Sequence, residues 1–248
     1  MTFRKSTGLL LLILCCFNPM ICSAASSAEP LFTYDIQLDG TAVIRSYMGN
    51  ETQVVIPGSV DGIQISAIGS KAFSGCSNIE KIVIPDAVTE IGVNAFENCT
   101  ALLQVEIPPS VQVIGDQAFI RCGLLQETSI PEGITAIPTG LFLHCTSLER
   151  VAIPESVRVI EDNAFAFCES LTEAVLPEHL EAIGSFAFGG CRNLQNVKIP
   201  KSTESIGGLA FADCENLIVA VTKDTYADQY CRQNHLHEII LPILPNAD

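Results

Sequence analysis

The sequence predicts an α/β-type repeat solenoid, a stack of similar coils in which each coil packs on its neighbours. Three residue types recur with a period of 23 residues and no slippage. The prolines are Pro85, Pro108, Pro131, Pro154, Pro177 and Pro200. The phenylalanines are Phe73, Phe96, Phe119, Phe142, Phe165, Phe188 and Phe211. The cysteines are Cys76, Cys99, Cys122, Cys145, Cys168, Cys191 and Cys214. A fixed period of this length indicates one supersecondary unit stacked on copies of itself.

Each unit begins with a short strand, as the unit around Leu102 shows. Leu102, Val105 and Ile107 are spaced so that alternate residues of the strand face inward. Pro108 follows directly and has no N–H to donate to a sheet, so it marks the end of the strand. Gly115 suits a backbone bend that a side chain would crowd.

Residues 1–25 are typical of a secretory signal peptide. Arg4 and Lys5 are followed by the apolar run Gly8–Phe17, and cleavage is expected at Ala24 or Ala25. The apolar run is too short for a stable membrane span. We therefore expect an exported protein, located in the periplasm, at the cell surface or outside the cell. A bacterial lipid anchor at Cys15 or Cys22 is the alternative, although Leu14 and Ile21 are bulky where such signals prefer a small residue.

The mature chain divides into two caps and an array of seven units. Residues 31–53 predict a β-hairpin cap, because Asp39-Gly40 separates two runs rich in β-forming residues. Residues 54–217 form the array, with a five-residue insertion around Asp61-Gly62 in its first unit. Residues 218–248 predict a cap with a short helix, a strand around His237 to Leu241 and a terminal tail.

The third and fourth units are the least regular. Pro138 and Glu161 replace the periodic glycine, and Leu141 replaces alanine. Thr128 and Thr203 stand at apolar positions. We expect any local change in the curvature of the stack near the third and fourth units.

The repeated unit resembles the BspA-like leucine-rich repeat, whose signature is IP..V..IG..AF..C..L..V.IP. All seven units match, and the resemblance runs from about Tyr34 to Ile240. It implies a curved solenoid with a parallel sheet on the concave side and irregular or short helical segments on the convex side. It also implies an exported surface or periplasmic protein, since several family members act as adhesins.

Composition and motifs argue against several functions. The formal net charge is −15, which repels nucleic acid and anionic lipid head groups. The sequence has no G-x-S-x-G, no H-E-x-x-H and no glycine-rich phosphate loop, so we expect no enzyme, no catalytic residues and no cofactor. His235 and His237 are interpreted as surface residues rather than metal ligands. An enzyme acting on envelope polymers would need a carboxylate pair in a deep cleft, which a thin solenoid wall rarely provides.

The periodic cysteines admit two readings. After removal of the leader, seven of them and Cys231 remain, and an even number in an exported protein is typical of disulfides. Equivalent residues of stacked coils, however, lie about 4.8 Å apart with parallel Cβ vectors, whereas a disulfide needs converging Cβ atoms at about 3.8 Å. A ladder of buried thiols is favoured, and one or two bridges remain the alternative.

The outward residues of the strands form two predicted columns. The charged column is Lys81, Gln104, Glu127, Arg150, Glu173 and Asn196. The small column is Val83, Glu106, Ser129, Ala152, Val175 and Lys198. Small or apolar residues with charges on either side are typical of a protein-contact patch. Small residues could equally relieve crowding where strands converge. A second apolar cluster on the convex side would comprise Ile120, Leu143, Phe167 and Phe186.

These observations favour a non-enzymatic module that binds a protein partner through the concave strand face. Two alternatives remain: a structural envelope or periplasmic scaffold without a specific ligand, and a binder of a small apolar ligand. The sequence leaves the oligomeric state open.

Overall fold

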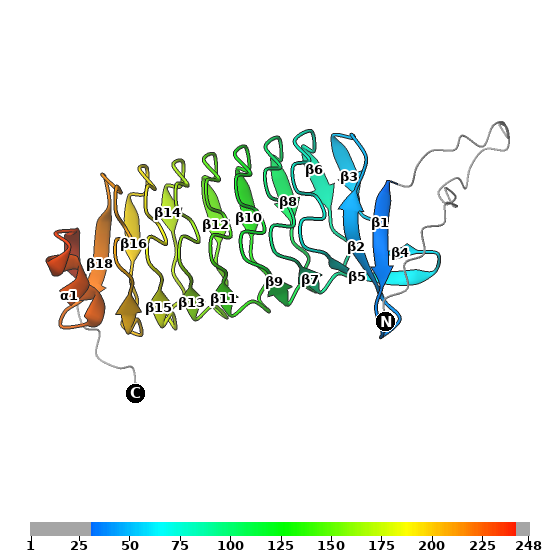
Figure 1. The fold of residues 1–248 in the computed structure, drawn as a ribbon. Coiled ribbons are helices and arrows are strands. Elements are labelled where there is room, and N and C mark those ends of the chain that lie inside the picture. The colour runs from blue at the N-terminus through cyan, green and yellow to red at the C-terminus, as the bar shows by residue number, and fades with distance from the viewer. Residues whose placement is uncertain (1–30, 242–248) are drawn as a thin grey trace, which may run out of the picture.

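The computed structural model describes residues 31–241, which form one solenoid with two rows of short strands (Figure 1). The first strand row contains β3 (Gln53–Val55), β6 (Lys81–Val83), β8 (Gln104–Glu106), β10 (Glu127–Ser129), β12 (Arg150–Ala152), β14 (Glu173–Ala174), β16 (Asn196–Lys198), β18 (Ile218–Thr222) and β19 (His237–Leu241). The second strand row contains β5 (Ile63–Ile68), β7 (Glu90–Ile91), β9 (Val113–Ile114), β11 (Ala136–Ile137), β13 (Val159–Ile160), β15 (Ala182–Ile183) and β17 (Ser205–Ile206). The predicted leader, 1–25, and the tail, 242–248, lie outside the described residues.

Strands of successive coils pair in parallel and in the register of the repeat. Lys81 lies opposite Gln104, and Glu127 lies opposite Arg150. The predicted strand of each unit is confirmed. The second strand row was not predicted from the sequence.

The carbonyl of each periodic proline helps to turn the chain between the two rows. It accepts the N–H three residues later, as in Val111 N to Pro108 O at 3.0 Å. The chain then reaches Gly115, where an added Cβ would lie 2.5 Å from Val93 N. The close approach of neighbouring backbones therefore explains the glycine at this position.

The second strand row is interrupted between β9 and β11. In regular coils the residue after the strand donates to the preceding coil, as Gly115 N does to Ile91 O at 2.7 Å. Pro138 occupies this position in the next coil and has no N–H. The sheet is therefore broken near the third and fourth units, where the sequence is least regular, and the change in curvature expected there stays a prediction. The first strand row is interrupted elsewhere, between β12 and β14.

The phenylalanines form one file of stacked rings through the stack. Ring centroids of successive coils lie 5.0–5.7 Å apart, and the rings are nearly parallel. The backbone supports the file, because Phe119 N donates to Leu141 O of the next coil at 3.1 Å. Tyrosines close both ends, Tyr47 by stacking on Phe73 at 5.4 Å and Tyr230 by an edge contact with Phe211 at 6.5 Å.

The segments that carry the phenylalanines are turns rather than helices, so the irregular form of the two expected is found. Each turn has two residues with positive φ, and these form two columns with the same period. The columns are Lys71, Asn94, Gln117, Gly140, Asn163, Phe186 and Leu209, and Gly75, Asn98, Arg121, His144, Phe167, Gly190 and Asp213. The asparagines and glycines tolerate this backbone, whereas Phe167 and Phe186 are bulky exceptions.

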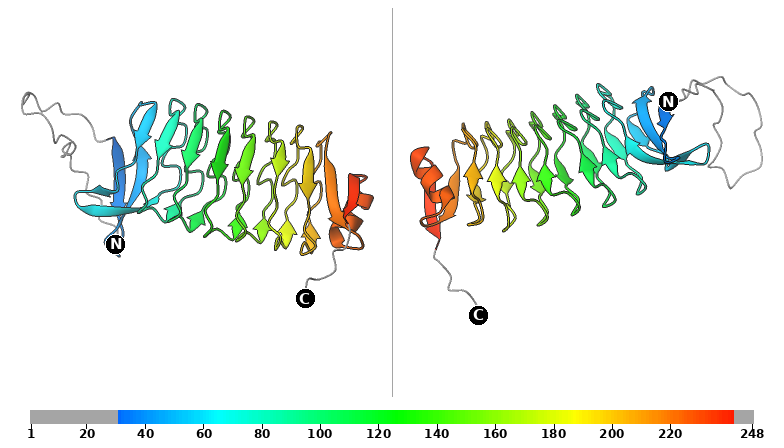
Figure 2. Two further views of the ribbon diagram at one scale, coloured as in Figure 1. Left: turned by 180° about the vertical axis from the view of Figure 1, so that it is seen from behind. Right: turned by 60° about the horizontal axis from the view of Figure 1, so that its bottom comes forward.

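The N-terminal end is closed by the predicted hairpin. Strands β1 (Phe32–Ile36) and β2 (Ala42–Tyr47) pair antiparallel, and β2 also pairs with β5. Figure 2 shows this hairpin at the opposite end of the stack from the helix. The insertion forms a second small hairpin, in which β4 (Ser59–Val60) pairs with β5 around Asp61 and Gly62, both with positive φ.

The C-terminal cap contains α1 (Tyr226–Gln233), the single helix of residues 31–241. Thr225 caps its N-terminus by accepting from Asp228 N at 3.3 Å. Tyr230 and Cys231 are buried against the last coil, and the Tyr230 hydroxyl accepts Ala210 N at 3.1 Å. The chain then returns as the predicted strand, β19, which pairs in parallel with β18.

Candidate functional site

The two predicted columns lie on the outer face of the first strand row. All their residues are exposed: Lys81, Val83, Gln104, Glu106, Glu127, Ser129, Arg150, Ala152, Glu173, Val175, Asn196 and Lys198. Between the columns runs a buried file that includes Ile82, Val105 and Val151. Alternation along each short strand thus places the small and charged side chains in solvent and the aliphatic ones in the core.

The strand register extends both columns beyond the predicted residues. Gln53 and Val55 of β3 precede them at one end. At the other end, Ile218 and His237 continue the charged column, and Ala220 and Ile239 continue the small column. The C-terminal cap is therefore part of the same face.

Sequence reasoning missed this extension because the spacing changes. Asn196 pairs with Ile218, which is 22 rather than 23 residues later. A signal was nevertheless available, since Leu217 follows Cys214 by three residues, as Leu194 follows Cys191. The alternating sequence of β18, IVAVT, also fits a strand.

A hollow of about 380 Å³ opens on this face at the C-terminal end, over β14, β16, β18 and β19. Its apolar lining includes Val175, Ile218, Ala220 and Ile239. Val175 is 66% exposed and Ile239 is 52% exposed, so this end of the sheet presents aliphatic side chains to solvent.

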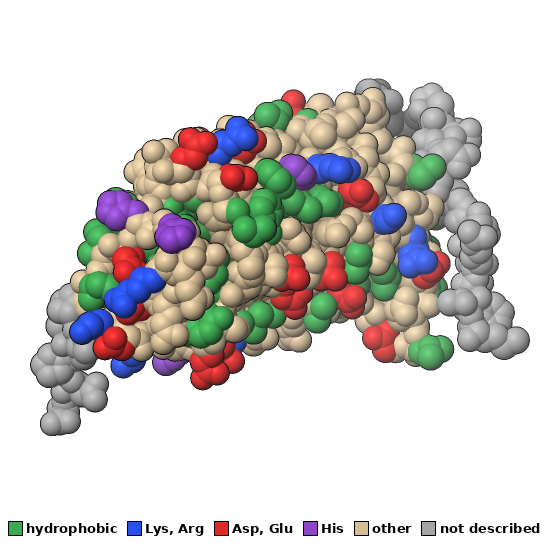
Figure 3. All heavy atoms as spheres, turned by 60° about the vertical axis from the view of Figure 1, so that its left-hand side comes forward, with side chains coloured by type: hydrophobic (Ala, Val, Ile, Leu, Met, Phe, Trp, Pro, Cys, Tyr) green, Lys and Arg blue, Asp and Glu red, His purple; other side chains and the backbone are tan. Residues whose placement is uncertain are grey.

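Charged groups surround the hollow. Glu173, Glu178 and Lys198 belong to its lining, and the Lys198 ammonium pairs with the Glu178 carboxylate. Glu178 N in turn donates to the Glu155 carboxylate at 3.3 Å. Because Lys198 is already paired, the rim of the hollow is acidic on balance. Figure 3 shows acidic, basic and hydrophobic side chains interspersed over one side of the solenoid.

The acidic residues after the prolines are exposed at Asp86, Glu132, Glu155 and Glu178. The third unit has Pro109 at this place, so the acidic edge is interrupted. These carboxylates follow the strands of the first row and add negative charge along one side of that row.

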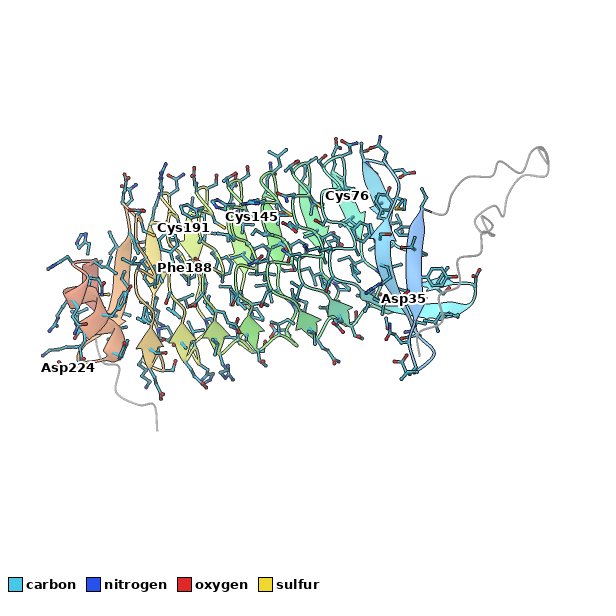
Figure 4. The ribbon with its side chains drawn as sticks, in the orientation of Figure 1. Asp35, Cys76, Cys145, Phe188, Cys191 and Asp224 are labelled. Atoms are coloured by element: carbon cyan, nitrogen blue, oxygen red, sulfur yellow. The ribbon has the colours of Figure 1, made fainter. Side chains whose placement is uncertain are left out.

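The cysteines form a ladder of free thiols in the core, and Figure 4 shows Cys76, Cys145 and Cys191 along one line of the stack. Each thiol from Cys99 to Cys214 donates to the phenylalanine carbonyl of the preceding coil, as in Cys145 Sγ to Phe119 O at 3.1 Å. Burial raises the pKa of Cys145 to about 12. These thiols are core packing residues with a weak internal hydrogen bond.

The predicted convex cluster is divided by the structure. Ile120 is buried, whereas Leu143, Phe167 and Phe186 are half-buried. The Phe167 ring stacks on the His144 ring at 4.6 Å, with 6° between the ring planes. The stack leaves little ring face free, so we assign these aromatic residues to the turn structure.

A second hollow of about 400 Å³ lies along β13, β15 and β17. Its two carboxylates are engaged locally: Thr139 donates its hydroxyl to Glu161 at 2.8 Å, and Ser185 N donates to Asp162 at 2.6 Å. Within residues 31–241, no group of three or more His, Cys, Asp or Glu side chains is placed to hold a metal ion. In the same range, no helix has the length and apolarity that a membrane span requires.

These features define a leucine-rich-repeat solenoid. The model of the BspA type leucine rich repeat region matches residues 66–175 and 158–243, with six copies, so the chain belongs to this family. Leucine-rich-repeat proteins commonly serve in protein recognition and are generally not enzymes.

Two crystal structures of leucine-rich repeat proteins are similar to this chain. The protein from T. pallidum is 29% identical, with a TM-score of 0.72, over 86% of this chain and 97% of the other. The protein from Bacteroides ovatus is 26% identical, with a TM-score of 0.51, over 85% of this chain and 66% of the other. The comparison with curated proteins finds no match.

Proposed function

We propose that this protein is an exported recognition module that binds a protein partner through the outer face of the first strand row. The contact would centre on Ala152, Val175 and the hollow beside them. Charged residues of the two columns would form its rim and select the partner.

The exposed aliphatic surface at the C-terminal end of the face carries this proposal. Val175 and Ile239 are more than half exposed, yet they sit on a sheet whose inward residues Ala174, Val197 and Val219 are buried in the core. Exposed apolar groups surrounded by charged ones are the usual anatomy of a protein interface. The sheet is already formed, so binding would require little reorganisation of the module.

Replacement of Ala152 and Val175 by arginine tests the proposal. Both side chains are exposed, so the double variant should fold with its stability within about 0.5 kcal/mol of the wild type. Partner capture from envelope extract should fall at least tenfold, because two long cations would cover the contact.

Val113→Arg is the matched control. Val113 is 52% exposed but lies in the second strand row, on another side of the coil. This variant should capture the partner normally. If the wild type, the double arginine variant and Val113→Arg captured the partner equally, the contact would lie elsewhere. If the wild type captured no partner specifically, a structural scaffold would be favoured.

The volume of the hollow also fits the alternative of a small apolar ligand, since ligand pockets usually span about 300–1,000 Å³. Such a ligand would be retained by the purified protein and lost in Val175→Arg. Native mass spectrometry and organic extraction of the purified protein would detect it.

A further inference from the structure

We infer that β19 is a dimerisation edge, at which two copies of this chain join their first strand rows through antiparallel β19–β19 pairing. This contact adjoins the proposed partner contact at Ile239, but the inference does not depend on partner binding.

Strand β19 ends a sheet on one side only. Within residues 31–241 the sheet order is β14-β16-β18-β19, so β19 pairs with β18 and has no strand on its other edge. In a paired strand, alternate backbone N–H and C=O groups point to opposite sides, and those of β19 that point away from β18 form a row of donors and acceptors. Such a row is satisfied most completely by another extended strand.

Strand β19 has one device that protects free edges, the inward-facing Glu238 opposite the buried Val219, and it lacks others. Its sequence, HEIIL, contains no lysine and no proline, and all five residues pair with β18 in unbroken register. Ile239 and Ile240 are 52% and 42% exposed, on opposite faces of the strand. The strand is therefore regular and presents one exposed isoleucine on each face.

The N-terminal edge strand differs in these respects. In the pairing of β1 with β2 the register shifts between Thr33 and Tyr34, which indicates a bulge. Asp35 of β1 forms an ion pair with Arg45 at 3.0 Å. A bulge and a charge both discourage pairing with another chain. The contrast identifies the C-terminal end as the one open to association.

The charge distribution also favours a second copy at this end. The chain as a whole is strongly acidic. In the cap, by contrast, two bases, Lys223 and Arg232, stand against three acids, Asp224, Asp228 and Glu238, and Arg232 pairs with Asp228 at 2.9 Å and with Glu238 at 3.3 Å. Two caps therefore repel each other less than two repeat arrays would.

The strand is complementary to itself in the antiparallel direction. With Ile239 opposite the partner's Ile239, Glu238 lies opposite the partner's Ile240 and His237 opposite the partner's Leu241. No two like charges face each other, and the central pair is aliphatic, which is a favourable cross-strand arrangement. A two-fold axis through Ile239 makes the interface isologous and closed.

Such a dimer would place the two hollows on either side of the two-fold axis, because Ile239 lines the hollow of each copy. The paired molecules would then present one continuous sheet face with two equivalent partner sites. Binding to a multivalent surface would gain from this duplication.

Sedimentation velocity of the mature chain over a range of concentrations tests the inference. The wild type should show a monomer–dimer equilibrium, with no larger species. Ile239→Lys should raise the dissociation constant at least about tenfold, because the two lysines would face each other across the axis. Val175→Lys adds the same charge on the same face away from the edge and should leave the equilibrium unchanged.

Two further variants report the register. Ile240→Lys should keep or strengthen the dimer, since each lysine would face the partner's Glu238. Ile239→Cys should form a disulfide-linked dimer on mild oxidation, whereas Val175→Cys should not, and the native thiols from Cys99 to Cys191 are buried. A monomeric wild type, a dimer unaffected by Ile239→Lys, or open-ended polymers would each overturn the inference. Loss of partner capture in the Ala152 and Val175 variant would leave it intact.

Discussion

The thiol ladder should make this protein lose stability steeply at alkaline pH. Burial raises the pKa of Cys145 from an ordinary value of 9.0 to about 12. Burial likewise raises the pKa of Cys231 to about 12, and raises that of Cys168 well above its usual range. The folded chain therefore holds protons that the unfolded chain releases.

The sign follows from proton linkage. Below pH 9.0 Cys145 is protonated in both states and adds no pH dependence. Between pH 9.0 and about 12 the unfolded state binds fewer protons, so the free energy of unfolding falls as pH rises. One thiol lowers it by about 1.4 kcal/mol per pH unit in that window, and by roughly 4 kcal/mol over the whole shift. Each further buried thiol adds to the slope.

Urea denaturation under reducing conditions, at intervals from about pH 8 to pH 10, measures this slope. Tyrosines add to the slope near the upper limit, because their usual pKa is about 10 and burial raises that of Tyr47 to about 12. The comparison with Cys145→Ala therefore isolates the contribution of one thiol. Cys145→Ala should reduce the slope by about 1.4 kcal/mol per pH unit above pH 9, whatever its effect on stability at neutral pH.

A flat profile between pH 8 and pH 10, or an unchanged slope in Cys145→Ala, would refute the reasoning. Either result would mean that the cysteines are not protonated thiols in the core. Thiol titration of the urea-unfolded protein, without reductant, provides the control and should find all eight cysteines of the mature chain reactive.

Two substitutions test the packing of the turns. Phe142→Ala should cost about 3–5 kcal/mol in the free energy of unfolding, because its fully buried ring stacks between two others at 5.7 Å each. Phe211→Ala should cost less, since its ring stacks on one phenylalanine. Denaturation curves in which Phe211→Ala is the less stable of these two variants would contradict the continuous ring file. Gly190→Ala should cost about 1–3 kcal/mol, because φ is +76° and the new Cβ would lie 2.6 Å from the Phe167 ring. Gly208→Ala, with no atom within 4 Å of the added Cβ, should be nearly neutral in the same assay.

Part of what sequence reasoning missed was present in the sequence. The left-handed backbone columns follow from periodic residues such as Asn94, Asn163, Gly140 and Gly190, which share a tolerance for positive φ. Phe167 occupies one of these columns although its side chain disfavours the conformation. Its conformation is imposed by the coils on either side, whose hydrogen bonds fix the turn.

Other features depend on contacts between segments that no local pattern encodes. The break in the second strand row arises where Pro138 meets the preceding coil without an N–H. The hollow forms because β18 and β19 continue the first strand row with a one-residue change in spacing. The break and the hollow are found only when neighbouring coils are placed against each other.

The sequence alone determined the repeat, its inward and outward residues, and the two columns from Lys81 to Lys198. It did so because each coil packs on nearly identical neighbours, so the spacing within one unit fixes the environment of every residue in the array. The tertiary structure decided how the array ends. There the last coil meets residues outside the period, and these contacts bring Ile239 and Val175 to one hollow and leave the edge of β19 open.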